Sequence, residues 1–335
     1  MRAPYLDDSD VTLYQGDVLD VLREMDAESV QTCVTSPPYW GLRDYGEQGQ
    51  IGLEPTPGEY VARMVEVFRE VRRVLRDDGT LWLNLGDSYA ANRGGTYQPA
   101  ETLAGGVSGR MPDGTKTNRG RGDRYMPSRD AAAHGLKHKD LVGIPWRVAF
   151  ALQEDGWYLR ADVIWSKPNP MPESVTDRPT KSHEYLFLLS KSPRYFYDYE
   201  AIREPLKSTP EQYLRAGKSV RENHEYGAVG GRPLGPTSFA TVPDGRNARS
   251  VWTITTKPYA GAHFATFPPE LPTRCIRAAS GPGDVVLDPF SGAATTALVA
   301  RGLGRRAVGI ELNPEYLAIS ADRLKQLSLL SEAAS

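Results

Sequence analysis

The sequence has few cysteines, little net charge and no apolar run long enough to span a membrane. Its two cysteines, Cys33 and Cys275, each lie in or beside an apolar stretch. This placement favours small core residues in a reducing compartment over a disulfide or a metal site. The five histidines show no metal-ligand spacing, and there is no signal peptide. We therefore expect a cytoplasmic protein that needs neither a metal nor a membrane.

A strand, loop and strand pattern near the C-terminus carries the first candidate site. The segment predicts a strand at Val285–Asp288, a tight loop at Pro289–Gly292, a helix at Ala293–Arg301 and a strand at Arg306–Glu311. The loop reads D-P-F-S-G instead of G-x-G-x-x-G, and no Walker-type Gly-Lys-Ser follows, so a triphosphate ligand is not expected. Glu311 ends the second strand at the spacing that places a carboxylate on ribose hydroxyls. An acidic loop suits a cofactor with a cationic end and no phosphate, although an ordinary Rossmann-like turn has the same pattern.

The second candidate site is the run TCVTSPPYW at residues 32–40. Proline cannot donate to a sheet ladder, so the strand Val30–Thr35 must end in a stiff turn. Open α/β sheets bind ligands at the carboxyl ends of their strands. The hydroxyl of Ser36 and the carbonyl of Pro37 can accept hydrogen bonds from an amino group, and the ring of Tyr39 can stack on a planar base. A strand-ending turn with a packed tyrosine explains these residues equally well when they are taken alone.

Together the motifs resemble the DNA amino-methyltransferases, which methylate the exocyclic amine of cytosine (N4) or adenine (N6). TSPPYW resembles the catalytic motif, DPFSG the cofactor loop and GIELNPEY the ribose-binding strand end. HFATFPPEL and YQGD resemble the elements that contact the methionine and adenine parts of the cofactor. The stretch 161–192 is similar to a further block of the family. The catalytic motif precedes the cofactor loop, as in the beta group, and Ser before Pro-Pro-Tyr is the form usual in N4-cytosine enzymes.

This resemblance implies S-adenosylmethionine as the cofactor and double-stranded DNA as the partner. It implies that the flipped base is held by Ser36, Pro37, Pro38 and Tyr39. It implies that the cofactor is bound by Asp17, Thr35, Phe267, Asp288, Pro289, Phe290, Ser291, Gly292, Glu311 and Asn313. We expect structural or backbone-contact roles for Lys167 and His183. Ser36 is not a strong base, so we expect the proton to leave after methyl transfer, toward solvent.

The expected fold is α/β, with a doubly wound, mostly parallel sheet in a Rossmann-like methyltransferase arrangement and an added target-recognition region. The motif order is circularly permuted, so the catalytic and cofactor strands lie far apart in sequence but should be neighbours in space. Further strands are predicted at Val11–Gln15, Thr80–Leu85, Trp157–Trp165 and Tyr185–Ser190. Helices are predicted at Val18–Met25, Glu59–Arg76, Ile144–Glu154 and Tyr316–Leu330. Residues 1–88 and 140–199 would form the catalytic half, and residues 258–335 the cofactor-binding half.

Two irregular stretches concentrate positive charge in a chain whose formal total is only −2. Residues 89–139 are rich in Gly and Arg, and we expect a mobile loop that clamps the DNA backbone. Residues 200–257 occupy the place of the target-recognition region in related enzymes. The candidate DNA-binding residues are Arg119, Arg121, Arg124, Arg232, Arg246 and Arg249. A solvated loop with scattered charge is the alternative for the first stretch.

Three functions stay open on the sequence. We favour a DNA N4-cytosine methyltransferase over an adenine-N6 methyltransferase of the same fold, and both over a DNA-binding relative without catalysis. Intact TSPPYW and DPFSG motifs speak against the inactive relative. Protein glutamine methyltransferases use a related Asn-Pro-Pro-Tyr motif, but the Ser, the motif order and the basic stretches disfavour that substrate. A cognate restriction endonuclease and a homodimer are further partners that we consider.

Overall fold

The computed structural model describes residues 2–42, 46–90, 135–206, 245–256 and 267–332. The chain divides into two compact units. The first comprises Met1–Tyr197 with Ser250–Ser335, and the second comprises Asp198–Arg249. Arg119, Arg121, Arg124 and Arg232 lie outside the described residues.

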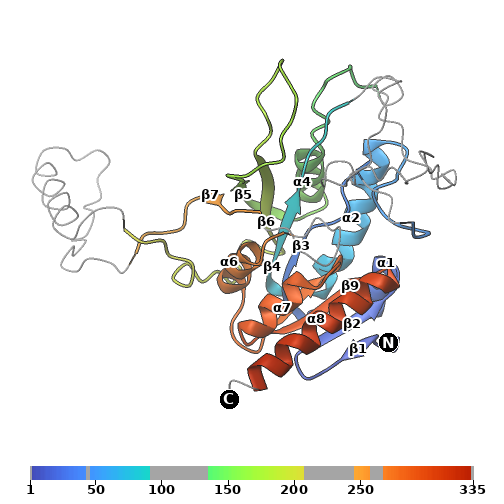
Figure 1. Cartoon of the computed structure of the whole chain (residues 1–335). Coiled ribbons are helices and arrows are strands. Elements are labelled where there is room, and N and C mark those ends of the chain that lie inside the picture. The colour runs from blue at the N-terminus through green and yellow to red at the C-terminus, as the bar shows by residue number, and fades with distance from the viewer. Residues whose placement is uncertain (1, 43–45, 91–134, 207–244, 257–266, 333–335) are drawn as a thin grey trace, which may run out of the picture. The chain divides into compact units, whose positions relative to one another are not determined.

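The first unit contains a nine-stranded sheet in which strands from both ends of the chain alternate (Figure 1). Across the sheet the strands are β1 (Leu6–Asp7), β2 (Val11–Gln15), β9 (Arg306–Glu311), β8 (Val285–Asp288), β3 (Val30–Thr35), β4 (Leu75–Leu85), β6 (His183–Ser190), β5 (Tyr158–Ser166) and β7 (Val251–Thr253). All neighbours from β2 to β4 are parallel. Strand β6 is antiparallel to both β4 and β5, and β1 is antiparallel to β2. The mostly parallel sheet predicted from the sequence is confirmed.

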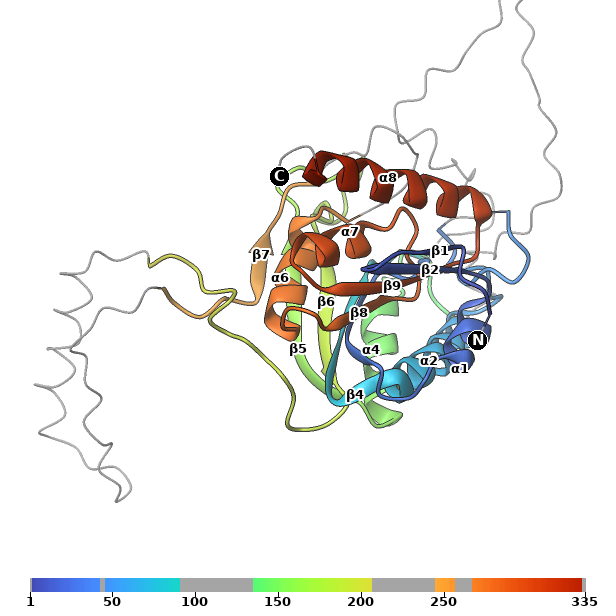
Figure 2. The same ribbon diagram turned by 90° about the horizontal axis from the view of Figure 1, so that it is seen from below.

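Helices cover both faces of this sheet (Figure 2). One face carries α1 (Val18–Glu24), α2 (Pro57–Val74) and α4 (Ile144–Glu154), and the other carries α6 (Glu270–Ala279), α7 (Thr295–Gly302) and α8 (Pro314–Glu332). A doubly wound sheet of this kind opens a ligand-binding edge at the carboxyl ends of its parallel strands.

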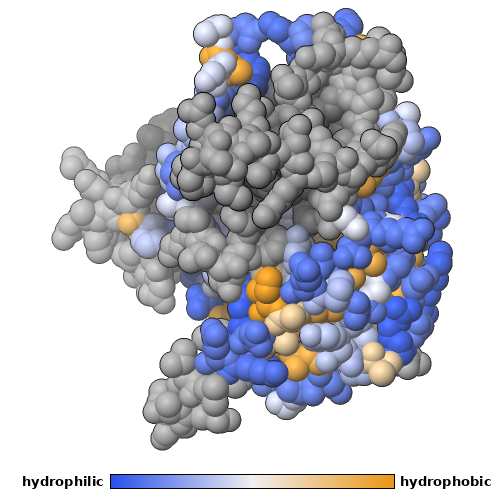
Figure 3. Space-filling model, turned by 45° about the vertical axis from the view of Figure 1, so that its right-hand side comes forward, coloured by the Kyte–Doolittle hydropathy of each residue, from blue (hydrophilic) through white to orange (hydrophobic). Residues whose placement is uncertain are grey.

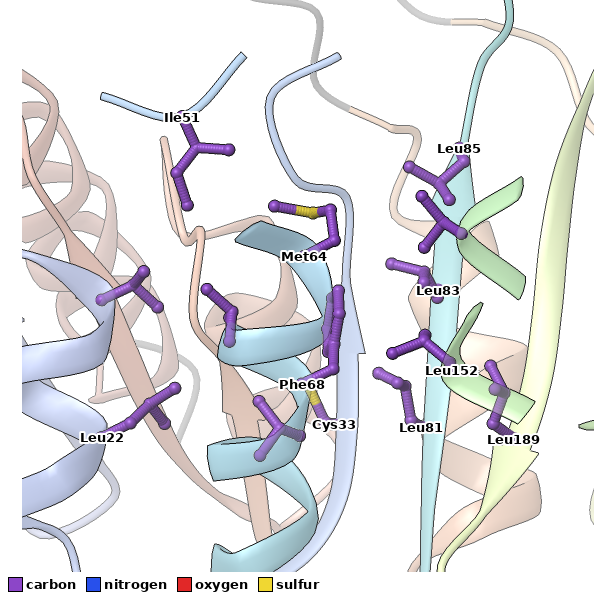
Figure 4. Packing of buried hydrophobic residues seen from close by; sticks show 14 of the residues in the cluster. Leu22, Cys33, Ile51, Met64, Phe68, Leu81, Leu83, Leu85, Leu152 and Leu189 are labelled. Carbon is purple, nitrogen blue, oxygen red and sulfur yellow. The ribbon is translucent and has the colours of Figure 1, made fainter. Parts of the chain in front are cut away.

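Helix α2 shows why the sequence folds in this way. Thr56 and Glu59 form a reciprocal capping box, and Pro57 occupies the first turn, where its missing N–H costs nothing. The apolar side chains of α2 recur every three or four residues and are buried. Met64 and Phe68 pack toward Cys33 on β3 and toward the leucines of β4 (Figure 4). This packing fixes the strand that leads into TSPPYW.

The strands Val11–Gln15, Val30–Thr35, Val285–Asp288 and Arg306–Glu311 have the predicted bounds. The predicted start of the strand at Thr80 was wrong, because β4 begins at Leu75. Val30 pairs with Leu75 and Thr32 with Thr80, so Asp77-Asp78-Gly79 forms an irregularity within the strand instead of a turn before it. Gly79 is required there, since a Cβ would lie 2.9 Å from the Arg76 carbonyl oxygen. Helix α6 and strands β1 and β7 were not predicted.

The described part of the second unit is held by its own contacts. Glu204 and Arg246 exchange two main-chain hydrogen bonds of 2.9 Å, and their side chains form an ion pair at 2.8 Å. The unit ends at Arg249, and β7 (Val251–Thr253) pairs with β5 in the main sheet. The predicted recognition region, residues 200–257, therefore extends a few residues into the sheet of the first unit.

Candidate active site

The predicted motifs meet at one edge of the sheet. Strands β2, β9, β8 and β3 are parallel neighbours, so their carboxyl ends lie side by side. Asp17 follows β2, Glu311 ends β9, Asp288 ends β8 and Ser36 follows β3. The fold thus brings together side chains from both ends of the chain, as the sequence predicts.

A buried hydrogen bond joins the two motifs directly. Thr35 Oγ1 donates to Asp288 Oδ1 at 2.6 Å across 253 residues of sequence. Thr296 Oγ1 donates to Asp288 Oδ2 at 2.7 Å, and the Phe290 amide donates to Oδ1 at 3.1 Å. Burial raises the pKa of Asp288, and these three donors oppose that rise. Thr35 and Asp288 therefore fix the turn and the loop relative to each other, a role that the sequence does not reveal.

Glu311 holds the cofactor loop from the neighbouring strand. Its Oε2 accepts from the Gly292 amide and its Oε1 from the Asn313 amide, both at 2.9 Å. Burial raises the pKa of Glu311 to about 7 despite these donors. Gly292 has a φ of +49°, which turns the loop back toward β9. The carboxylate keeps lone pairs for a further ligand, because each oxygen has room for about two donors.

The other predicted cofactor residues differ in how far they are already engaged. Asn313 Oδ1 accepts from the Glu315 amide at 2.8 Å and so begins α8. Ser291 Oγ is buried and has no hydrogen-bond partner among the described residues. Pro289 is buried, and Phe290 is half-buried against the core. Phe267 is half-buried at the start of the segment that leads into α6.

Asp17 has a partner that sequence reasoning missed. Its Oδ1 accepts from the amides of Leu19 and Asp20 and begins α1, and its Oδ2 lies 3.5 Å from Arg63 of α2. Arg63 also lines an open hollow of about 420 Å³. The other lining residues are Gly49, Gln50, Ile51, Glu54, Glu59, Ala62 and Glu66.

The backbone of the TSPPYW turn is held by the structure around it. Tyr60 of α2 donates its hydroxyl to the Pro38 carbonyl at 2.8 Å. The indole of Trp40 donates to the Glu54 carbonyl at 2.9 Å, and Trp40 is only 3% exposed. Pro37 is buried, while Ser36 and Tyr39 are half-buried at the sheet edge. The turn is rigid, as its two prolines predict.

The hydroxyl of Tyr39 enters a polar cluster that the sequence did not predict. It donates to Glu184 Oε2 at 2.8 Å and lies 3.4 Å from Ser36 Oγ. Glu184 is also paired with Lys167, which gives that lysine a structural partner. Burial, together with the charge of Glu184, raises the pKa of Tyr39 well above its usual range, so the side chain stays a neutral phenol. Glu184 stands beside His183, whose pKa is lowered by burial.

The ring of Tyr39 packs on a position without a side chain. A Cβ at Gly86 would lie 2.5 Å from Tyr39 Cε2 and 3.0 Å from Cδ2. Gly86 therefore lets the ring lie directly against the backbone that follows β4. A glycine directly after an apolar strand was the signal in the sequence, but nothing local connects it to Tyr39.

Two of the candidate DNA-binding arginines are described. Arg246 is ion-paired with Glu204 inside the second unit, and Arg249 is exposed. Among the described residues, no three His, Cys, Asp or Glu side chains are grouped as a metal site, and no helix is long and apolar enough to cross a membrane. The part of the surface that Figure 3 shows in colour is mainly hydrophilic, with apolar residues in small patches.

Comparison with known proteins gives matches over nearly the whole chain. A family model described as DNA methylase matches residues 30–322. The Type II methyltransferase M.XycI of Xanthomonas campestris pv. cyanopsidis is 51% identical over 315 residues, which cover 94% of this chain and 87% of that protein.

Two solved structures have the same fold. The putative DNA modification methylase TTHA0409 of Thermus thermophilus, complexed with S-adenosyl-L-methionine, is 25% identical with a TM-score of 0.55, over 94% of this chain and 93% of that one. PvuII DNA methyltransferase, which is cytosine-N4-specific, is 21% identical with a TM-score of 0.59, over 95% of this chain and 87% of that one. At the latter identity the likeness is one of fold.

Proposed function

Since this chain belongs to the DNA methylase family that acts on N4 of cytosine or N6 of adenine, and whose cofactor is S-adenosylmethionine, we propose that it methylates the N4 amine of a flipped cytosine at a specific site in duplex DNA. The observation that carries the proposal is the hydrogen bond between Thr35 and Asp288. It holds the TSPPYW turn against the DPFSG loop. A base gripped by the first motif would therefore lie beside a cofactor gripped by the second.

The residues at the sheet edge fit the cofactor. Glu311 has free lone pairs for ribose hydroxyls, and Ser291 Oγ is a buried hydroxyl without a partner among the described residues. Asp17 would take the adenine end, and Phe290 would pack against it. When bound, S-adenosylmethionine supplies a methyl group on a positively charged sulfur with a neutral leaving group. The carboxylates of Asp288 and Glu311 make the site acidic, which suits that charge.

The TSPPYW turn would prepare the amine for attack. The lone pair of the N4 amine is drawn into the ring, so the amine is a poor nucleophile. Ser36 Oγ and the Pro37 carbonyl would accept its two N–H hydrogens and favour a more tetrahedral nitrogen. The ring of Tyr39 would stack on the flipped base, with its other side against Gly86. The turn is held rigidly, so positioning supplies much of the catalysis.

Product analysis tests the choice of base. We expect labelled S-adenosylmethionine and duplex DNA to yield N4-methylcytosine after digestion to nucleosides. Ser36→Ala should bind cofactor almost normally and lose single-turnover rate on the order of 10²-fold, by analogy with other preorganised hydrogen-bond sites. N6-methyladenine as the product would contradict the proposal and establish the adenine alternative. A product-free reaction with intact DNA binding would favour the inactive relative.

The DNA contacts are part of the same proposal. We assign backbone contacts to residues 89–139 and target recognition to the region around the second unit, Asp198–Arg249. Arg249 is more exposed than Arg246, so it is the better candidate of the two for a base contact. We further propose a cytoplasmic enzyme that shares its site with a restriction endonuclease, and we keep a homodimer as an expectation.

A further inference from the structure

A chain of hydrogen-bonding groups leads inward from the hydroxyl of Ser36. Ser36 Oγ lies 3.4 Å from Tyr39 Oη, and Tyr39 Oη lies 2.8 Å from Glu184 Oε2. The other oxygen of Glu184 accepts from Lys167 Nζ. The side chains of Glu184 and Lys167 are only 17% and 18% exposed. The chain therefore runs from the site edge into the protein and ends on a carboxylate that is largely shielded from water.

The chemistry of Glu184 fixes the direction of every bond in this chain. An ionised carboxylate can only accept hydrogen bonds. Tyr39 must then donate its proton toward Glu184, which leaves Tyr39 Oη as an acceptor for Ser36. Ser36 in turn donates its proton inward, so the lone pairs of Ser36 Oγ face outward.

Asn84 reinforces this direction. Its Nδ2 donates to the Tyr185 carbonyl and to Glu184 Oε2, both at 3.1 Å. Its Oδ1 therefore faces Tyr39 Oη, at 3.4 Å, as a second acceptor. Both groups beyond the Tyr39 hydroxyl accept, and neither offers a proton that would reverse the chain.

We propose that Glu184 is a positioning residue that orients Ser36 Oγ as a hydrogen-bond acceptor for the exocyclic amine, acting through Tyr39. The inference rests on the proposed function, because it assigns Ser36 to the amine. It adds a role for a residue of β6 that does not touch the base. A hydroxyl that rotated freely would present its proton to the amine part of the time and would fail to draw the amine N–H away from the ring.

The pairing with Lys167 makes the isosteric amide an informative variant. In Glu184→Gln a single oxygen faces donors on opposite sides, with Lys167 on one side and Tyr39 with Asn84 on the other. One side must then meet an NH₂ group. Replacing Lys167 by Met removes the competing donor, so the amide oxygen of Lys167→Met/Glu184→Gln can face Tyr39 again. The double variant should restore the acceptor without restoring the charge.

The experiment measures single-turnover methyl transfer at saturating cofactor and DNA, together with the dissociation constants of both. Glu184→Gln is expected to slow transfer about tenfold, the size of effect seen when an orienting partner is lost, with both dissociation constants nearly unchanged. Lys167→Met/Glu184→Gln should recover most of the rate. Tyr39→Phe, which keeps the ring and removes the hydroxyl, should be slowed like Glu184→Gln. Glu154→Gln, an exposed position at the end of α4, is the matched control and should react at the wild-type rate.

A wild-type rate in Glu184→Gln would overturn the inference. A slow Glu184→Gln whose rate the double variant fails to recover would also overturn it, because a merely structural role predicts no recovery. If Glu184→Gln does not fold, Tyr39→Phe decides, and a wild-type rate there rejects the role. The nucleoside product of the wild-type enzyme is identified in the same reactions. N6-methyladenine would reject the cytosine proposal while leaving the rate comparison readable, since adenine presents the same kind of amine.

Discussion

Replacing Thr35 by Val tests the bond that joins the two motifs. Valine has nearly the shape of threonine and removes only the hydroxyl that donates to Asp288 at 2.6 Å. Both residues are buried, at 1% and 3% exposure, so water cannot take over the bond. A hydrogen bond to a charged group contributes about 1.5–3 kcal/mol. We expect a loss of about 2 kcal/mol in the free energy of unfolding, roughly a 30-fold change in the unfolding constant.

Thr32→Val is the matched control on the same strand. Thr32 is fully buried, and its hydroxyl lies 3.1 Å from the Thr80 carbonyl and 3.1 Å from the Thr80 hydroxyl, which are neutral partners. Its loss should cost about 0.5–1.5 kcal/mol. Thr35→Val should also weaken cofactor binding, because the DPFSG loop loses an anchor, whereas Thr32→Val should not.

The effect of Thr35→Val should depend on pH. Burial raises the pKa of Asp288, and the Thr35 hydroxyl lowers it, so the variant raises that pKa further. A folded-state pKa above the unfolded value makes ionisation costly to the fold, so the extra destabilisation is largest at neutral pH and shrinks in acid. Urea unfolding of both variants at neutral and acid pH, with calorimetry of cofactor binding, measures this. Equal losses in the two variants with no pH dependence would refute the reasoning.

Cofactor affinity should fall below a pH of about 7, because the pKa of Glu311 is raised to about 7 and its protonated form accepts ribose hydroxyls less well; calorimetric titrations across pH should lose this slope in Glu311→Gln. Gly86→Ala should lower methyl transfer with unchanged cofactor affinity, since its Cβ would displace the Tyr39 ring; a wild-type rate would argue against stacking by Tyr39. Salt-series binding should show weaker affinity for all duplexes, and a log–log slope lower by about 0.9 per lost phosphate contact, on neutralising Arg119, Arg121 and Arg124. Arg249→Ala should instead change which duplex is preferred, and the reverse pattern would exchange the two assignments.

The cofactor half of the site was predictable because its signals are local. Strand β8, the DPFSG loop and β9 follow one another within 27 residues, and turn chemistry and hydrophobic runs fix their bounds. Asp288 and Glu311 are strand-end residues, so their place at the edge follows from the parallel topology alone. The sequence also predicted that TSPPYW ends a buried strand, since proline cannot continue the ladder.

The cluster around Tyr39 was not predictable, because it depends on the register of antiparallel strands. Asn84 pairs with Leu186, which puts Glu184 two residues further along β6 on the same face. Glu184 pairs with Trp165, which brings Lys167 within reach. A shift of one residue in either pairing would turn Glu184 to the other face. No local pattern in the sequence specifies that register.

The placement of β3 between β4 and β8 has a consequence for biosynthesis. All six residues of β3 are buried in the finished sheet, yet the residues that bond Thr35 and Asp288 together are 253 positions apart. At a synthesis rate of about 5–20 residues per second, β3 waits roughly 10–50 s for the neighbour that covers its second edge. During that interval the nascent chain presents an open apolar strand edge that can pair with another copy. A chain truncated before β8 keeps that edge open permanently, so premature termination yields an aggregation-prone product instead of a partly active enzyme.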